Sequence, residues 1–274
     1  MTQIEYFPKG MNFVVEGVER KWANYGVVQY LGTFEGNPKR YQVVSVTLQK
    51  GTQNIVKSPF FIPIPPAVAQ EITHYVADQL NMKIKDEYND GLQYLAQLVS
   101  PVKGEVEPGD LVAWGIGIRN SVIGNFRIGA SLLRLVCSNG MMEPEDAEIS
   151  TVEKSYNVEA MKDSFLAKAQ LLQETFEERL ELFRSFKQYK MNQQFAELLA
   201  KSFPAPILKD LVTLGKNKIV QNFAQKNLWE AYNDITYQIS HRKLKLTTRF
   251  DWSLKATKIF EEFIREQKQE AQTS

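Results

Sequence analysis

The chain has 274 residues, of which 43% are hydrophobic and 24% are charged, and its formal net charge is +1. These values are typical of a globular protein and argue against general disorder. The single cysteine, Cys137, excludes an internal disulfide, and no apolar stretch approaches the roughly 20 residues that a membrane helix needs. We therefore expect a cytoplasmic protein without a membrane partner, in the host cell cytoplasm if its source is viral.

The first 140 residues are rich in β-branched and aromatic side chains and predict antiparallel strands. Stretches 26–34 and 40–50 flank a turn signal at 35–38, which predicts a β-hairpin, and residues 11–19 allow a further strand. Residues 59–66 contain four prolines, so an extended connector is expected there.

A helix is expected to begin at Pro66, because proline suits the first helical turn. After it, three apolar stretches at 92–99, 111–118 and 126–137 are separated by turn signals. This arrangement predicts a three-strand meander that completes the β-rich part, residues 1–140.

The second half has helical periodicity. Apolar residues step by three or four from Val158 to Tyr189, which predicts one helix on the order of 45–50 Å long. Further helices are expected at 193–201, 206–223, 226–240 and 253–270. We therefore expect a single α+β domain over 1–274, with a helical part at 151–266 and a frayed polar tail at 267–274. The linker at 143–150 is short, which favours one shared core.

Charge is distributed unevenly in the second half. Residues 141–181 carry 11 acidic and 4 basic side chains, residues 184–226 carry 8 basic and 2 acidic ones, and residues 236–258 carry 6 basic and 1 acidic. This asymmetry indicates a basic binding face or self-association through complementary faces. Alternatively, these are solvated helix surfaces whose charges cancel.

The helix expected at 226–240 carries a polar aromatic row. Asn233, Tyr237 and His241 are spaced four residues apart, beside Trp229, and the row leads into a basic run that contains Arg242, Lys243 and Lys245. The row is a candidate ligand face. The alternative is that Asn233 and His241 satisfy buried backbone groups and cap the helix.

Two motifs in the chain resemble the phage/plasmid-like protein family, which is built on a widespread domain of unknown function. The first runs from Ile118-Arg119-Asn120-Ser121 through Gly124 to the strand end Leu133–Gly140, and the second is the helix from Leu228-Trp229 to His241. The similarity covers roughly residues 90–245. This chain has Ile149–Val152 where family members carry an Arg-His pair, so no role of that pair is transferred. The resemblance implies a mobile genetic element, in a replication or recombination context.

Arginines at the expected meander are candidates for phosphate binding. Arg119 should end one strand and Arg127 should begin the next, so the two would meet near one hairpin, with Asn120 and Ser121 as neutral donors. Arg134 lies further along the same strand as Arg127. The alternative is turn chemistry for Asn120 and Ser121, and a carboxylate partner for each arginine.

Other chemistries have weaker signals. Cys137 could pair with His241 as a nucleophile, but a cysteine at an apolar strand end is usually a small buried hydrophobe. The acidic residues of 143–148 could hold a hard cation, as in a nuclease, although a solvated charge run is the simpler interpretation. No metal or cofactor is predicted.

The leading hypothesis is a non-enzymatic nucleic-acid-binding protein of a virus or plasmid that binds single-stranded DNA for annealing or recombination. Its predicted contact residues are Arg119, Asn120, Arg127, Arg134, Trp229, Asn233, Tyr237, His241, Arg242, Lys243, Lys245 and Arg249, with Trp252 as a further base-stacking candidate. Annealing proteins that form rings or filaments suggest a homo-oligomer. The alternatives are an oligomeric structural or host-interaction protein that assembles through the helix at 158–189, and a hydrolase that uses Asn233 and His241 near Asn120.

Overall fold

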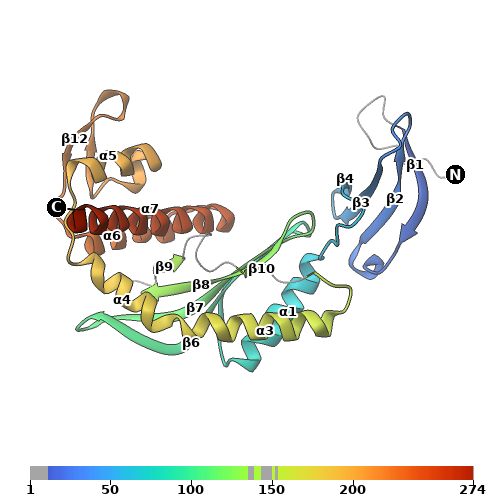
Figure 1. Ribbon diagram of the computed structural model, residues 1–274, viewed down its shortest axis with the longest axis horizontal. Helices are drawn as coiled ribbons and strands as arrows, with labels where there is room; N and C mark the ends of the chain where they lie inside the picture. Colours follow the sequence, from blue (N-terminus) through green and yellow to red (C-terminus); the bar gives the residue numbers. More distant parts are fainter. Residues whose placement is uncertain (1–11, 135–138, 143–149, 152–153, 274) are drawn as a thin grey trace.

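The computed structural model describes residues 12–134, 139–142, 150–151 and 154–273. It has the predicted α+β fold, with antiparallel sheets in the first half and helices in the second. The molecule is elongated: a small N-terminal sheet lies at one end, a larger sheet occupies the middle, and the last helices lie at the other end (Figure 1).

The N-terminal sheet contains four antiparallel strands in chain order. These are β1 (Phe13–Glu19), β2 (Val27–Phe34), β3 (Arg40–Leu48) and β4 (Gly51–Lys57). The predicted hairpin is confirmed as β2 and β3, and the further strand as β1. Strand β4 was not predicted, because its first four residues are polar or glycine and its extended form comes from pairing with β3.

A proline-rich connector joins this sheet to helix α1 (Pro66–Gln79), which begins at the predicted proline. The buried amide of Gln42 donates to the carbonyl of Ser58 at 2.7 Å and also to that of Phe61. Gln29 donates in turn to the Gln42 side-chain oxygen at 2.7 Å. These bonds satisfy connector carbonyls that lack a sheet partner, and they fix the connector against the first sheet.

The central sheet has the order β10-β8-β7-β6-β5, with β9 paired to the end of β8. Its strands are β5 (Lys83–Asn89), β6 (Gln93–Glu107), β7 (Asp110–Ser121), β8 (Phe126–Arg134), β9 (Asn139–Met142) and β10 (Ser150–Thr151). The predicted meander is confirmed as β6, β7 and β8. The edge strand β5 was missed, because its lysine and acidic residues resemble a polar loop.

The long helix expected at 158–189 is two helices, α3 (Val158–Glu174) and α4 (Phe176–Phe186). The prediction of one helix was wrong at Thr175, whose hydroxyl donates to the Leu172 carbonyl at 2.7 Å and competes with the regular helical bond. The apolar residues that step by three or four along both helices pack in the chain's own core, whereas Leu171 of α3 is 60% exposed. The apolar periodicity that suggested helix pairing between chains is therefore explained by packing within this chain.

The segment 206–223, expected to be helical, is a short 3₁₀ helix followed by a β-hairpin. Its strands are β11 (Val212–Leu214) and β12 (Val220–Phe223). The helical prediction was wrong because Gly215 and a left-handed Asn217 end any helix there. The hairpin packs beside helix α5 (Gln193–Ser202), which agrees with its predicted range.

Helix α6 (Leu228–His241) begins with a capping box, in which Asn227 and Glu230 bind each other's backbone amides. Helix α7 (Leu246–Thr273) begins earlier than expected and includes all but the last residue of the predicted frayed tail. None of the helices within the described ranges combines the length and the apolar character needed to cross a bilayer.

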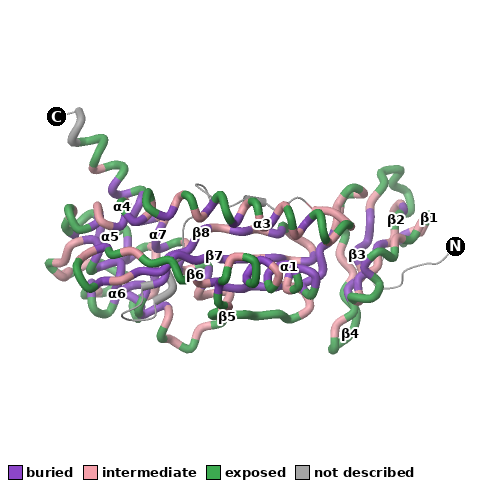
Figure 2. Tube along the Cα trace, turned by 90° about the horizontal axis from the view of Figure 1, so that it is seen from below, coloured by how far each residue is buried: buried purple, intermediate pink, exposed green. Residues whose placement is uncertain are grey.

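One buried cluster contains residues from the N-terminal sheet, the connector, the central sheet and every α-helix of the described chain. Helices α1 and α3 cover one face of the central sheet, while α6 and α7 lie on its other side (Figures 1 and 2). On that second side Phe250 of α7 packs on Leu95 of β6. The rest of this second face is the setting of the candidate site.

Candidate nucleic-acid interface

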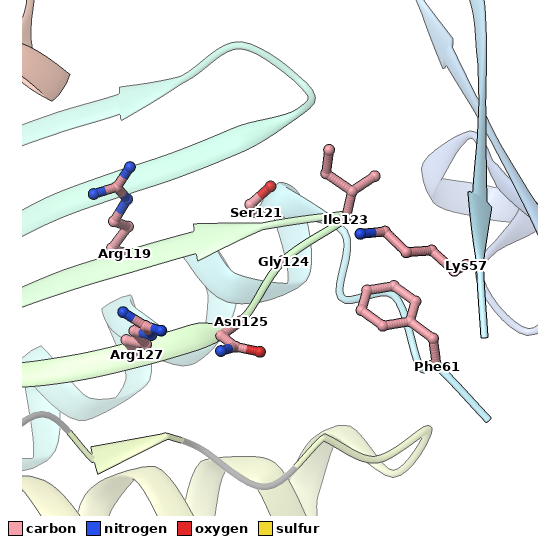
Figure 3. Close-up of a pocket in the computed structure, with 8 residues that line it drawn as sticks. All are labelled: Lys57, Phe61, Arg119, Ser121, Ile123, Gly124, Asn125 and Arg127. Atoms are coloured by element: carbon pink, nitrogen blue, oxygen red, sulfur yellow. The ribbon is translucent and has the colours of Figure 1, made fainter.

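A pocket of about 500 Å³ opens where strand β4, the connector and the β7–β8 turn meet. Its lining is mostly basic and polar. The two apolar side chains, Phe61 and Ile123, lie on the side of the pocket nearest the N-terminal sheet (Figure 3). The lining residues are Lys57, Phe61, Arg119, Ser121, Ile123, Gly124, Asn125 and Arg127. We refer to it as the cationic pocket.

Two of the predicted phosphate-binding arginines line this pocket. Arg119 of β7 stands directly opposite Arg127 of β8 in the sheet register, so both project from the same face. The prediction that they meet near one hairpin is confirmed. The expected carboxylate partner is also present for Arg119, which contacts Asp251 of α7 at 2.8 Å between Nη1 and Oδ1.

Two lysines flank the ring of Phe61. The ammonium of Lys154 lies 4.0 Å from the ring centroid and that of Lys57 lies 5.2 Å from it. Lys154 also donates to the carbonyl of Gly124 in the β7–β8 turn. Burial, together with the nearby charge of Lys57, lowers the pKa of Lys154 to about 8. An incoming anion would relieve this repulsion, which makes the pair suited to phosphate.

Phe60, the neighbour of Phe61 in the connector, has a side chain that is 92% exposed. An aromatic ring this exposed gains nothing from the protein core, and base stacking is a recognised use for such a ring. Phe60 and its neighbours Lys57, Phe61 and Lys154 were all missed by the sequence interpretation. Their only local signal is a Phe-Phe pair within a proline-rich segment.

Asn120 is not available to a ligand and is withdrawn from the predicted contact set. Its side chain is fully buried, and its Nδ2 donates to the carbonyl of Ile64 at 3.0 Å. The amide therefore fixes the connector to the end of β7. The role is structural, but it is not the turn chemistry stated as the alternative, because Asn120 lies within β7 and its partner is 56 residues away in the chain.

Trp229 and Asn233 are also corrected. Trp229 is 1% exposed, its ring packs against Phe183, and its indole N–H donates to Asp110 at 2.9 Å. Asn233 is 7% exposed. Helix α6 is buried on two faces because α4 and α7 both pack against it, so neither residue can contact bases.

The end of α6 and the loop after it remain accessible. Tyr237 and His241 stack at 4.0 Å between ring centroids, and the His241 Nδ1 donates to the Tyr237 carbonyl. Arg242 donates to the carbonyl of Pro206 at 2.6 Å and therefore has a structural role. Lys243 and Lys245 are exposed.

The start of α7 is tied to the central sheet by two ion pairs. One joins Arg119 to Asp251, and the other joins Arg249 to Asp86 of β5 at 4.0 Å. The structure thus places the basic loop before α7 on the side of the sheet that carries the pocket arginines. Trp252 is half-buried and packs on the core, so its ring is only partly accessible.

Three predicted features fall outside the described side chains. Arg134 occupies a backbone position in β8 that pairs with Val112 and Asn139. Cys137 and the acidic residues of 143–148 lie outside the described residues.

Comparison with protein-family models, with curated proteins and with solved structures gave no match. The functional interpretation therefore depends on the geometry of this chain.

Proposed function

We propose that the protein binds single-stranded nucleic acid, with single-stranded DNA as the preferred ligand, through the cationic pocket. One observation supports the proposal above the others. The ammonium groups of Lys57 and Lys154 lie 5.2 Å and 4.0 Å from the centroid of the Phe61 ring, and Arg119 and Arg127 line the same pocket. The exposed ring of Phe60 is next to Phe61 in the chain. Cationic groups for the backbone and an aromatic platform for a base are the two requirements of single-strand binding.

The exposed ring favours a single strand over a duplex. A base can stack on Phe60 only if its face is free, and in a duplex both faces of each base are already stacked. The arginines supply planar donors for phosphate, while the lysines supply compact charges beside the ring. The strand would run from the connector across the ends of β7 and β8, toward Lys245 and Lys243.

The wider role remains part of the same proposal. Annealing or recombination in a virus or plasmid is supported by the resemblance of the two motifs to the phage/plasmid-like family. The first motif keeps Arg119 as a contact candidate, whereas Asn120 of the first motif and Trp229 of the second are buried and are no longer candidates. The support therefore concerns biological context, whereas the binding chemistry comes from the pocket.

The test is fluorescence anisotropy with labelled single-stranded DNA, single-stranded RNA and duplex DNA, over a series of salt concentrations. Tight binding with a steep salt dependence is expected for single-stranded DNA, because released counterions drive the association. Lys57→Ala and Arg127→Ala should each weaken binding and lower the magnitude of the salt slope by about 0.7, the value for one phosphate on a single strand.

Phe60→Ala should weaken binding without changing the salt slope, since stacking releases no counterions. Its expected cost is about 1–3 kcal/mol, the usual range for one stacked base. Lys39→Ala is the matched control, because Lys39 is an exposed lysine on the same sheet as Lys57 but lies on the β2–β3 turn. Absence of binding at low salt would refute the proposal and favour the structural or host-interaction alternative.

A further inference from the structure

The β11–β12 hairpin ends in a tight basic turn at the opposite end of the molecule from the N-terminal sheet (Figure 1). The Ile219 amide donates to the Lys216 carbonyl at 3.3 Å, and the Gly215 amide donates to the Ile219 carbonyl at 2.8 Å. Asn217 and Lys218 between them have φ values of 58° and 59°. Two consecutive left-handed residues give the narrow two-residue turn of a rigid hairpin.

The identity of the second turn residue is unexpected on conformational grounds. Glycine is the preferred residue at this position of such a turn, because a side chain at positive φ is strained. Lys218 occupies it, with its side chain exposed, and within the described ranges no hydrogen bond or ion pair involves its ammonium. The fold therefore gains nothing evident from the lysine, which points to a use outside the chain.

The sequence around the turn has charges of one sign. From 211 to 229 the sequence contains Lys216, Lys218 and Lys226 and no aspartate or glutamate. Lys226 is engaged by Asp234, whereas Lys216 and Lys218 are exposed at the tip. Ile219 beside them is 65% exposed, an unusual exposure for isoleucine.

We infer that the tip of the β11–β12 hairpin is a second contact surface, which binds the backbone of double-stranded DNA. A two-stranded hairpin is narrow enough to enter a groove of a duplex, where the two lysines can reach phosphates on its rims. Ile219 would then be placed to insert between base steps, as apolar side chains do in minor-groove-binding proteins. The tip projects outward and its turn has no aromatic residue, so it lacks the stacking platform that a single strand requires.

This inference is separate from the proposed function, because the hairpin and the cationic pocket lie on different elements. The experiment measures anisotropy with a blunt-ended labelled DNA duplex and with single-stranded DNA of the same length. The variants are Lys216→Ala, Lys218→Gly and Ile219→Ser. Lys218→Gly is the most informative, because it removes the ammonium and also relieves the strained backbone.

Lys216→Ala and Lys218→Gly should each weaken duplex binding severalfold and lower the magnitude of its salt slope by about 0.9. Lys218→Gly should also leave the Tm unchanged or raised, which distinguishes a lost contact from a damaged fold. Lys50→Ala is the matched control, an exposed lysine at the tight β3–β4 turn. Single-strand affinity should be unaffected by the hairpin variants, whatever the cationic pocket binds.

The inference is overturned if wild-type protein does not bind the duplex at low salt. It is also overturned if Lys218→Gly and Lys216→Ala bind the duplex as wild type does. Loss of single-strand binding in Lys57→Ala with retained duplex binding would support both surfaces independently. Equal loss of both ligands in the hairpin variants would instead assign the hairpin to the single-strand site and refute a separate duplex surface.

Discussion

Asp251 holds the pocket arginine Arg119 in the free protein, and its replacement should strengthen nucleic-acid binding. Asp251→Asn keeps the side-chain shape and removes one negative charge at 2.8 Å from the guanidinium. The two side chains are 51% and 42% exposed, so the pair contributes only about 0–1 kcal/mol to folding. The variant should therefore fold normally, and any change in affinity is a change at the site.

The gain in affinity can be estimated from the charge removed. Repulsion between a carboxylate and a phosphate about 4 Å apart is roughly 1 kcal/mol in water. This corresponds to about fivefold tighter binding. In the variant, Arg119 could also contact its phosphate without first breaking an ion pair to Asp251.

The assay is anisotropy with labelled single-stranded DNA across a salt series, for Asp251→Asn, Arg119→Ala and the double variant. In the Arg119→Ala background the gain from Asp251→Asn should shrink, because no guanidinium is released. Glu262→Gln controls for charge, since Glu262 lies on the same helix, is 51% exposed and is about 16 Å further along the axis. Equal gains from Glu262→Gln and Asp251→Asn, or no gain from either, would refute the role assigned to Arg119.

Three further predictions concern protonation and folding. Because the pKa of Lys154 is lowered to about 8, its charge is lost as the pH rises past that value, so single-strand affinity should fall between about pH 7 and 9. Lys154→Arg should remove this dependence, as measured by anisotropy against pH. Trp229→Phe should lower the free energy of urea unfolding by about 1.5–3 kcal/mol, because the Asp110 oxygen loses its indole donor, with single-strand affinity unchanged. Asn227→Ala should cost about 1 kcal/mol in the same unfolding assay, because the cap of α6 is lost.

Elements with their own local signals were predictable from the sequence. The first hairpin has β-branched strands around a turn signal, and α6 has a cap residue before its apolar period. Strands β4 and β5 lack such signals in their own sequences. Each is extended because it pairs with a longer neighbouring strand, and a sequence pattern does not report that pairing. Segment 206–223 was misassigned since its apolar spacing suits a helix, while Gly215 and Asn217 impose a turn.

The candidate site was only partly predictable for a related reason. Arg119 and Arg127 flank one turn, so a prediction of the strands places them together. Lys57 and Lys154 are distant in the sequence and meet only at the ring of Phe61 in the folded chain. Trp229 was misjudged because the apolar periodicity of α6 indicates only one buried face. The second buried face, which carries Trp229, depends on another helix packing against α6 in the folded chain.

Groups outside the lining of the cationic pocket fix the connector that carries Phe61. Buried Gln29 and Gln42 bind each other and the connector carbonyls, and Tyr156 donates to Gln29 at 2.9 Å. Tyr156 lies two residues after Lys154, so the same network that fixes Phe61 also fixes the approach of the second lysine. Lys154, whose ammonium also donates to the Gly124 carbonyl, is therefore positioned by the fold before any anion arrives. Binding would then require little ordering of this lysine, and more of its electrostatic attraction would appear as affinity.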